Sequence, residues 1–435
     1  MRAIGVRALA ATAFNILVGG GIFVLPAAVA AGLGAAAPLA YIVCAIAMGL
    51  IVLCFAEAGS RVARTGGLYA YVEVALGSYA GFLSGVLLWL PSSFGQAAVS
   101  SAFAGTLAFL VPALGGPVGR TLVLAALLGI FAFVNYRGVR QAARFVEVVT
   151  IAKLLPLVLL LVAGAIVLAG SPTLDALVWP DELPSAAALG STAVTLFFAF
   201  AGLEAALAPS GEIREPSRTV PRALAVAMTT VTLLYVAIHL VVQGLLGPEQ
   251  LAVEKDAPLA AAARVALGTA GGVIIAIGAA VSMFGHGSGM MLAMPRALFA
   301  FARDGILPRK LASVHPRYHT PHVAILAQAV AIWILAATTG FEQLARLATV
   351  SVLLLYLLCC VAAWVLRRKD VRGDGVPFRA PGGALVPLLA CAVIIWLLTS
   401  ASATEFGIVA AVLTVGSVAW RITRRSVAPV HVRSG

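Results

Sequence analysis

The sequence predicts an all-α, polytopic membrane protein with twelve transmembrane helices. Of its 435 residues, 62% are hydrophobic and only 11% are charged, and the mean hydropathy is +1.05. This composition excludes an ordinary soluble domain. Apolar runs of about 20 residues, the length that spans a bilayer, recur from Ala8 to Trp420. Two of these runs are interrupted by glycine, and the interruptions predict where helices break.

The expected spans are separated by short polar or charged loops. The first run has no small-residue cleavage site followed by a polar domain, so we interpret it as a retained span and not as a signal peptide. The twelve spans are 8–32, 37–60, 81–111, 119–136, 145–170, 188–209, 221–247, 269–302, 322–339, 343–366, 383–400 and 404–421.

The first span is interrupted by three consecutive glycines, Gly19, Gly20 and Gly21. Each glycine costs about 1 kcal/mol against alanine inside a helix, and Pro26 follows closely, so we expect two half-helices joined by unwound backbone. Unwound backbone survives at membrane depth only where it is buried in protein or lines a cavity. The free N–H groups and positive dipole end of the second half-helix favour a carboxylate there. A glycine-rich helix-packing face is the alternative.

The sixth span has a matching interruption at Gly202, followed by the carboxylate of Glu204. Glycine-interrupted segments at corresponding positions of two halves point to a transporter binding site. Because spans 1 and 6 are five apart, we expect five helices repeated with inverted topology, so that helices 1 and 6 are the discontinuous ones. The first repeat covers 1–170 and the second 188–367, and helices 11 and 12 (382–425) fall outside the repeat.

Polar side chains inside other spans are further candidates. Lys153 is the only Lys or Arg that we place inside a span, where a charge costs at least about 2.5–3.5 kcal/mol. We interpret it as functional, and snorkelling of its ammonium to the interface is the alternative. Ser93 and Gln96 of span 3 are expected to line a substrate pocket, although such residues also hold helices together. Ser282 and His286 lie in span 8.

The distribution of basic residues predicts the orientation. With an even number of spans, both termini lie on one side, and nearly all of the 29 Lys and Arg fall in loops on that side. The opposite side holds only Arg120, Lys255, Arg264 and Arg346. The positive-inside rule therefore places both termini in the cytoplasm.

Composition also bounds the partners. The net charge of +12 is spread through short loops, so it is explained by membrane topology and no nucleic-acid partner is expected. The five cysteines lie in apolar runs without metal-site spacing, and we interpret them as small buried hydrophobes. No organic cofactor and no metal are implied. The expected partners are the lipid bilayer and a small solute, and the oligomeric state is left open.

Four motifs together resemble the amino acid, polyamine and organocation (APC) superfamily of secondary transporters, over spans 1 to 10. The glycine break resembles the family's G-[ST]-G-I-F, with Gly20 in place of the hydroxyl residue. The other three are Phe198-Ala199-Phe200-Ala201-Gly202-Leu203-Glu204, which resembles F-x-F-x-G-x-E, the loop from Gly211 to Arg222, which is similar to G-E-x-x-x-P-x-R-x-x-P-R, and the span-8 exit from Arg296 to Pro308.

The resemblance implies a five-plus-five inverted-repeat fold in which an amino acid binds in both breaks. Its carboxylate would meet N–H groups after Gly19, its ammonium would meet carbonyls freed in span 6, and Phe198 would be an aromatic lid. The expected substrate-binding residues are Leu17, Gly19, Gly20, Gly21, Ile22, Ser93, Gln96, Phe198, Ala199, Ala201 and Gly202. The expected coupling or gating residues are Lys153, Glu204, Ser282 and His286, of which His286 is not part of the family pattern.

These observations predict a sodium-independent amino acid transporter of the cytoplasmic membrane that works by alternating access, either with proton coupling or as an exchanger. Lys153 lies where many sodium-independent members carry a lysine, whose ammonium takes the place of a sodium ion. A polyamine or cationic amino acid exchanger of the same fold is the alternative, although Glu204 is the only acidic residue expected near the cavity. An intramembrane enzyme would need paired carboxylates, a metal cluster or a nucleophile–base pair at depth, and the sequence shows none. A channel or receptor is the third rival.

Overall fold

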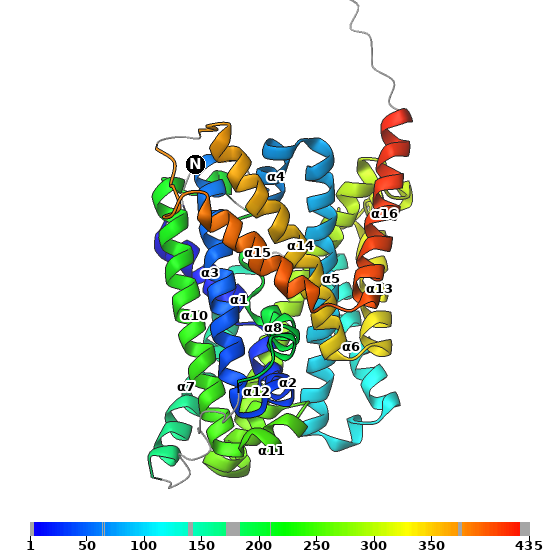
Figure 1. Cartoon of the computed structure of the whole chain (residues 1–435). Helices are drawn as coiled ribbons and strands as arrows, with labels where there is room; N and C mark the ends of the chain where they lie inside the picture. The colour runs from blue at the N-terminus through cyan, green and yellow to red at the C-terminus, as the bar shows by residue number, and fades with distance from the viewer. Residues whose placement is uncertain are drawn as a thin grey trace, which may run out of the picture.

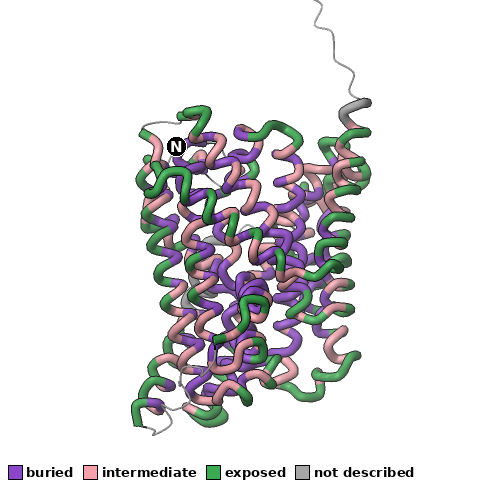
Figure 2. The backbone as a smooth tube through the Cα atoms, in the orientation of Figure 1, coloured by how far each residue is buried: buried purple, intermediate pink, exposed green. Residues whose placement is uncertain are grey.

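The computed structural model describes residues 4–62, 64, 66–137, 142–170, 183–208, 210–372 and 376–426. In this part of the chain the regular secondary structure is helical, apart from one isolated bridge between Ile4 and Ile213. Long helices run roughly side by side from one end of the bundle to the other (Figure 1). Buried residues concentrate in the middle of the bundle, and its outer surface is mostly exposed (Figure 2).

Eight helical segments of the described residues are long and apolar enough to cross a membrane. They are Gly21–Arg61, Ser78–Leu110, Pro117–Arg137, Ala186–Ala206, Pro216–Leu246, Pro258–Arg303, Phe341–Arg368 and Ala403–Thr423. Four shorter apolar helices accompany them: Val6–Leu17, Lys153–Ala169, His322–Thr338 and Leu385–Thr399. Each of the twelve spans expected from hydropathy coincides with one of these segments or with a neighbouring pair. The segment 171–182, between the two predicted repeats, lies outside the described residues.

The first half of the chain begins with a broken helix. α1 (Val6–Leu17) and α2 (Gly21–Leu33) are separated at the three glycines, and Pro26 lies inside α2. The predicted break is therefore confirmed. The helices that follow are α3 (Ala37–Arg61), the short α4 (Leu68–Leu76), α5 (Ser78–Leu110), α6 (Pro117–Arg137) and α7 (Ala142–Ala169), with single 3₁₀ turns η1 (Gly34–Ala36) and η2 (Pro112–Leu114).

The second half begins in the same way. Two residues, Ala201 and Gly202, separate α8 (Ala186–Phe200) from α9 (Leu203–Ala206), which confirms the predicted break in span 6. The remaining elements are η4 (Ser210–Glu212), α10 (Pro216–Leu246), α11 (Pro248–Val253), α12 (Pro258–Arg303), η5 (Arg309–Ala312), α13 (His322–Thr338), α14 (Phe341–Arg368), α15 (Leu385–Thr399) and α16 (Ala403–Ser426).

Span 8 differs from its expected bounds. The sequence places its start at residue 269, whereas α12 begins at Pro258 and is kinked at Gly268, whose φ of 71° and ψ of −169° are not helical. Glycine adopts this backbone at low cost because it has no Cβ. The residues before the kink are helical, with 258–263 buried, and α11 beside them packs on α2.

The chain start and the loop after span 6 are joined at one end of the bundle. Ile4 N donates to Glu212 O at 3.1 Å, and Arg214 N donates to Ile4 O at 2.9 Å. The first described residues and the C-terminal end of α16 lie at this same end (Figure 1). Near the C-terminal end of α3, the buried carboxylate of Glu57 accepts hydrogen bonds from Arg61 of the same helix and from Arg367 of α14. The helices around both breaks are therefore fixed at this end.

Candidate functional site

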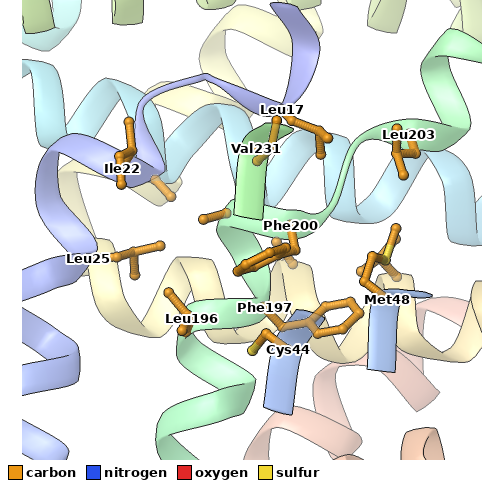
Figure 3. Packing of buried hydrophobic residues seen from close by; sticks show 14 of the residues in the cluster. Leu17, Ile22, Leu25, Cys44, Met48, Leu196, Phe197, Phe200, Leu203 and Val231 are labelled. Carbon is orange, nitrogen blue, oxygen red and sulfur yellow. The ribbon is translucent and has the colours of Figure 1, made fainter. Parts of the chain in front are cut away.

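The two helix breaks face each other in the middle of the bundle. Leu17 and Ile22 flank the first break and Phe200 and Leu203 flank the second, within one apolar cluster (Figure 3). Gly202 has a φ of 124°, a backbone conformation that residues with a side chain rarely adopt. A Cβ at Gly202 would also lie 2.9 Å from Ile16 Cγ2. Glycine is thus required there by its backbone and by its approach to α1.

A small central cavity of about 70 Å³ lies between the breaks. Its walls come from both breaks and from α5, α12 and α14. The residues that line it are Ile16, Leu17, Gly19, Gly20, Gly21, Pro91, Ser92, Gly95, Val99, Phe198, Ala199, Ala201, Gly202, Glu204, His286, Met290, Ala348, Thr349 and Val352. Most of these are apolar or glycine, and the polar side chains among them are Ser92, Glu204, His286 and Thr349.

The carbonyls at the first break are held by side chains from three other helices. Lys153 Nζ of α7 donates to Asn15 O at 2.6 Å and to Val18 O at 2.7 Å. Tyr235 Oη of α10 donates to Leu17 O at 2.6 Å, and Ser282 Oγ of α12 lies 3.5 Å from Gly19 O. Two amides here are engaged, because Gly19 N donates to Leu17 O at 2.7 Å and Phe23 N donates to Gly20 O at 3.2 Å. The amides of Gly20, Gly21 and Ile22 donate no hydrogen bond to the residues that the structure describes. The first break therefore presents amide donors to the central cavity.

Lys153 does not snorkel. Its residue is 4% exposed, and its ammonium is bound to carbonyls of the first break rather than directed to an interface. It lines a second cavity of about 270 Å³, which we call the lysine cavity, together with Ser282. Four residues line both cavities and form the partition between them: Ile16, Gly19, His286 and Met290.

The second break has the opposite pattern. Its amide is engaged, because Gly202 N donates to Glu204 Oε2 at 3.1 Å. The same carboxylate oxygen accepts from Tyr356 Oη of α14 at 2.5 Å. At the end of α8 the carbonyl of Ala199 already accepts from Tyr235 Oη at 3.2 Å, and that of Phe197 accepts from Ala201 N at 3.0 Å. The carbonyls of Phe198, Phe200 and Ala201 accept no hydrogen bond from the residues that the structure describes. The second break therefore presents acceptors to the central cavity.

A third and larger cavity lies beyond the central one, on the side away from Lys153. Its volume is about 580 Å³. We call it the charged cavity, because charged residues of both signs line it: Arg120, Lys255, Asp256, Glu342, Arg346 and Glu405. Phe341 lines the charged cavity and Phe198 lines the central one. Their rings meet edge to face at 5.9 Å between centroids. This pair separates the two spaces.

Most of the predicted site residues line one of the first two cavities. Leu17, Gly19, Gly20, Gly21, Phe198, Ala199, Ala201, Gly202, Glu204 and His286 line the central cavity, and Lys153 and Ser282 line the lysine cavity. Ile22 does not line them and is 1% exposed, with its side chain in the apolar cluster (Figure 3). The role of each residue in binding or coupling stays a prediction.

Ser93 and Gln96 are placed elsewhere. Ser93 Oγ accepts from Gln328 Nε2 of α13 at 3.0 Å, and Gln96 is buried with Nε2 at 3.5 Å from Ser100 Oγ. Ser93 therefore holds α5 to α13, which was the alternative interpretation, whereas Gln96 bonds within α5 itself. Helix periodicity explains the difference, because a helix turns about 100° per residue. The face of α5 that reaches the central cavity carries Ser92, Gly95 and Val99 instead.

Several residues around the site were not expected from the sequence. Tyr235 ties the two breaks together, Tyr356 holds Glu204, and Met290 and Thr349 line the central cavity. The sequence did indicate that the two tyrosines have a specific contact, because a tyrosine inside an apolar span needs a partner for its hydroxyl. The partner could not be read from the sequence. Among the described residues, no group of three or more His, Cys, Asp or Glu is placed to hold a metal ion.

The comparison with known proteins agrees with this architecture. Residues 4–421 match the profile of a family described as amino acid permease. The chain is 33% identical over 420 residues to an uncharacterized transporter of Mycobacterium tuberculosis (strain ATCC 25618 / H37Rv), covering 94% of this chain and 88% of that protein. It is 27% identical over 396 residues to a serine/threonine exchanger of Bacillus subtilis (strain 168), covering 89% and 88%.

A third relative shows that substrates differ within this group. The chain is 28% identical over 406 residues to a methylthioribose transporter of Bacillus subtilis (strain 168), covering 88% of this chain and 85% of that protein. The matches span nearly the whole chain and include both helix breaks. The chain therefore belongs to the amino acid permease family of the APC superfamily, a family of membrane transporters and not of enzymes.

Proposed function

We propose that this protein is a secondary transporter of neutral L-amino acids and holds its substrate between the two helix breaks. The observation that carries the proposal is the opposite polarity of the breaks. The first presents N–H donors whose neighbouring carbonyls are already bound by Lys153, Tyr235 and Ser282. The second presents carbonyls at the end of α8. A carboxylate fits the first and an ammonium fits the second.

The size of the central cavity favours a small neutral side chain. About 70 Å³ is well below the 300 Å³ or so at which pockets for drug-sized ligands begin. Glu204 is the only carboxylate among the residues that line this cavity, and it already accepts from Tyr356 and Gly202. A polyamine or a cationic amino acid would bring a second positive charge without a free carboxylate to meet it. This argues against the cationic alternative.

The arrangement of helices supports a five-plus-five repeat followed by two further helices. Helix pairs α1/α2 and α8/α9 are the broken ones, and four predicted spans lie between them. We assign 1–170 and 188–367 to two repeats of inverted topology and 382–425 to helices 11 and 12. We assign all twelve spans to the cytoplasmic membrane. The excess of Lys and Arg in the loops at the end of the bundle that holds both termini supports assigning that end to the cytoplasm.

Alternating access follows from the two barriers around the central cavity. Phe198 and Phe341 close it toward the charged cavity, and Ile16, Gly19, His286 and Met290 separate it from the lysine cavity. Opening one barrier at a time would carry the substrate across. Lys153 supplies a fixed or titrating positive charge at the first break, so sodium is not required. If its proton is exchanged during the cycle, transport is coupled to protons; if its charge is fixed, the protein is an exchanger.

The test uses purified protein and then proteoliposomes. A thermal-shift screen covers the twenty amino acids and common polyamines, because a ligand at 100 times its dissociation constant stabilises by about 2.7 kcal/mol. Solutes that shift the melting temperature are then assayed for sodium-free uptake into proteoliposomes, with and without the same solute inside. We expect neutral amino acids to be taken up with saturation and trans-stimulation. Uptake that shows neither property, or that is confined to polyamines, would contradict the proposal.

Coupling is decided in the same proteoliposomes. Proton coupling predicts that uptake rises as external pH falls and that an inward pH gradient drives accumulation. Exchange predicts strong trans-stimulation and little response to the gradient. Because both mechanisms use Lys153, a requirement of the parent protein for sodium would contradict both.

A further inference from the structure

At Gly20, where the related motif carries a hydroxyl residue, the first break has little room for a side chain. A Cβ at Gly20 would lie 3.2 Å from both methyl carbons of Val99 and 3.3 Å from Met283 Cγ. Such contacts are tight, and a hydroxyl beyond the Cβ would need still more space. A side-chain hydrogen bond from position 20 to a carboxylate is therefore disfavoured, and a residue of a neighbouring helix can supply one instead.

His286 of α12 lies directly against the break. Its Nδ1 is 3.6 Å from the point that a Cβ on Gly19 would occupy. The side chain is half-buried and lines both the central cavity and the lysine cavity. Neither ring nitrogen makes a hydrogen bond to any residue that the structure describes. By contrast, the other histidine within a long apolar helix, His239, is fully buried and bonds to Tyr41 and Gln243.

The surroundings of His286 favour an anion over a cation. Lys153 lines the same lysine cavity and holds its ammonium on the carbonyls of Asn15 and Val18, on the α1 side of Gly19. The positive charge of Lys153 and the positive dipole end of α2 thus both act on the region beside His286. Each neutral imidazole tautomer offers one N–H donor. The group that best satisfies it here is an oxygen carrying negative charge.

We propose that His286 is a substrate-binding residue that donates a hydrogen bond to the substrate carboxylate, beside the backbone amides of Gly20 and Gly21. This rests on the proposed function and adds to it a side-chain contact that helps to distinguish acids from their uncharged derivatives.

The experiment compares two replacements of similar size that differ in their donor. His286→Leu removes the ring N–H donor, and His286→Gln keeps a side-chain N–H donor on its amide. Uptake of radiolabelled L-threonine into proteoliposomes gives KM and Vmax, and L-threoninamide, which lacks the charged carboxylate, serves as a competitor. We expect the KM of His286→Leu to rise at least about tenfold, about 1.4 kcal/mol, with Vmax within about threefold of the parent. His286→Gln should restore most of the affinity, and inhibition by the amide should be unchanged.

Controls separate this role from packing. His286→Met, a second replacement without a donor, keeps the test valid if the leucine variant does not fold, and His239→Gln changes a buried histidine away from the cavities. An unchanged KM in both donor-free variants would overturn the role of His286 while leaving the proposed function intact. Equal weakening of threonine and threoninamide would overturn the carboxylate contact. Failure of the parent to bind or take up any amino acid would overturn the proposed function and this inference together.

Discussion

The two helix breaks look alike in sequence and differ in what surrounds them. Each is a glycine interruption in an apolar run, at Gly19–Gly21 and at Gly202. At the first, side chains of Lys153, Tyr235 and Ser282 occupy the carbonyls. At the second, Glu204 occupies the amide of Gly202. Unwound backbone exposes donors and acceptors equally, and neighbouring side chains decide which of them remain for a ligand.

The largest effect is expected from Lys153→Ala, which removes the charge that binds the first break. The carbonyls of Asn15 and Val18 would lose their donor in a buried place, and an unsatisfied buried group costs about 1–3 kcal/mol. Uptake into proteoliposomes should fall to background. Lys369→Ala is the matched control, because Lys369 also donates to a backbone carbonyl, that of Ala75 at 3.0 Å, far from both breaks. Normal transport by Lys153→Ala would remove this residue from the mechanism.

Gly21→Val should lower uptake at least about tenfold without unfolding the protein. A Cβ at Gly21 would lie 3.2 Å from Leu25 Cδ1 and 3.3 Å from Ala199, so the larger valine pushes the two breaks apart. Size-exclusion chromatography in detergent should show a monodisperse protein. Gly49→Val is the control, because nothing lies within 4 Å of a Cβ there. Equal uptake by both variants would mean that the close approach of the breaks is not needed.

Tyr235→Phe tests the link between the breaks, since one hydroxyl bonds both Leu17 O and Ala199 O. Losing it should reduce uptake about three- to thirtyfold and lower the melting temperature, with a cost on the order of 1–2 kcal/mol. The control is Tyr79→Phe, whose hydroxyl bonds Ser417 at an exposed site. If the two substitutions have the same small effect, the breaks do not depend on this bridge.

The smallest effect is expected from Phe198→Ala, which acts on the barrier and not on the breaks. The edge-to-face pair with Phe341 contributes about 0.5–1.5 kcal/mol beyond its buried area. KM should therefore rise a few fold as water enters the central cavity. Phe133→Ala, at a side chain that is 56% exposed on the outer surface, should leave KM unchanged. A KM unaffected by Phe198→Ala would show that this ring is not a lid.

Hydropathy and glycine placement predicted the helices and both breaks well, because these features depend on local sequence. Which residues of α5 line the central cavity was not predicted well, as Ser93 and Gln96 show, because the rotation of α5 is set by its packing against α13 and α14. Gln328, which bonds Ser93 Oγ, comes from far along the chain. The tyrosines that bind the breaks were missed for the same reason. Residues 235 and 356 are distant from residues 17 and 204 in sequence, and only the folded bundle brings them together.

The most direct test of the account is counterflow in proteoliposomes with three related solutes. Vesicles loaded with L-threonine are given external L-threonine, its amide, which lacks the charged carboxylate, or 3-hydroxybutanoate, which keeps the carboxylate and lacks the ammonium. If the first break holds a carboxylate and the second an ammonium, only the complete amino acid should exchange at a high rate, and removal of either charge from the solute should slow exchange at least about tenfold. Exchange of the amide or of the hydroxy acid at the same rate as threonine would contradict the assignment of opposite charges to the two breaks.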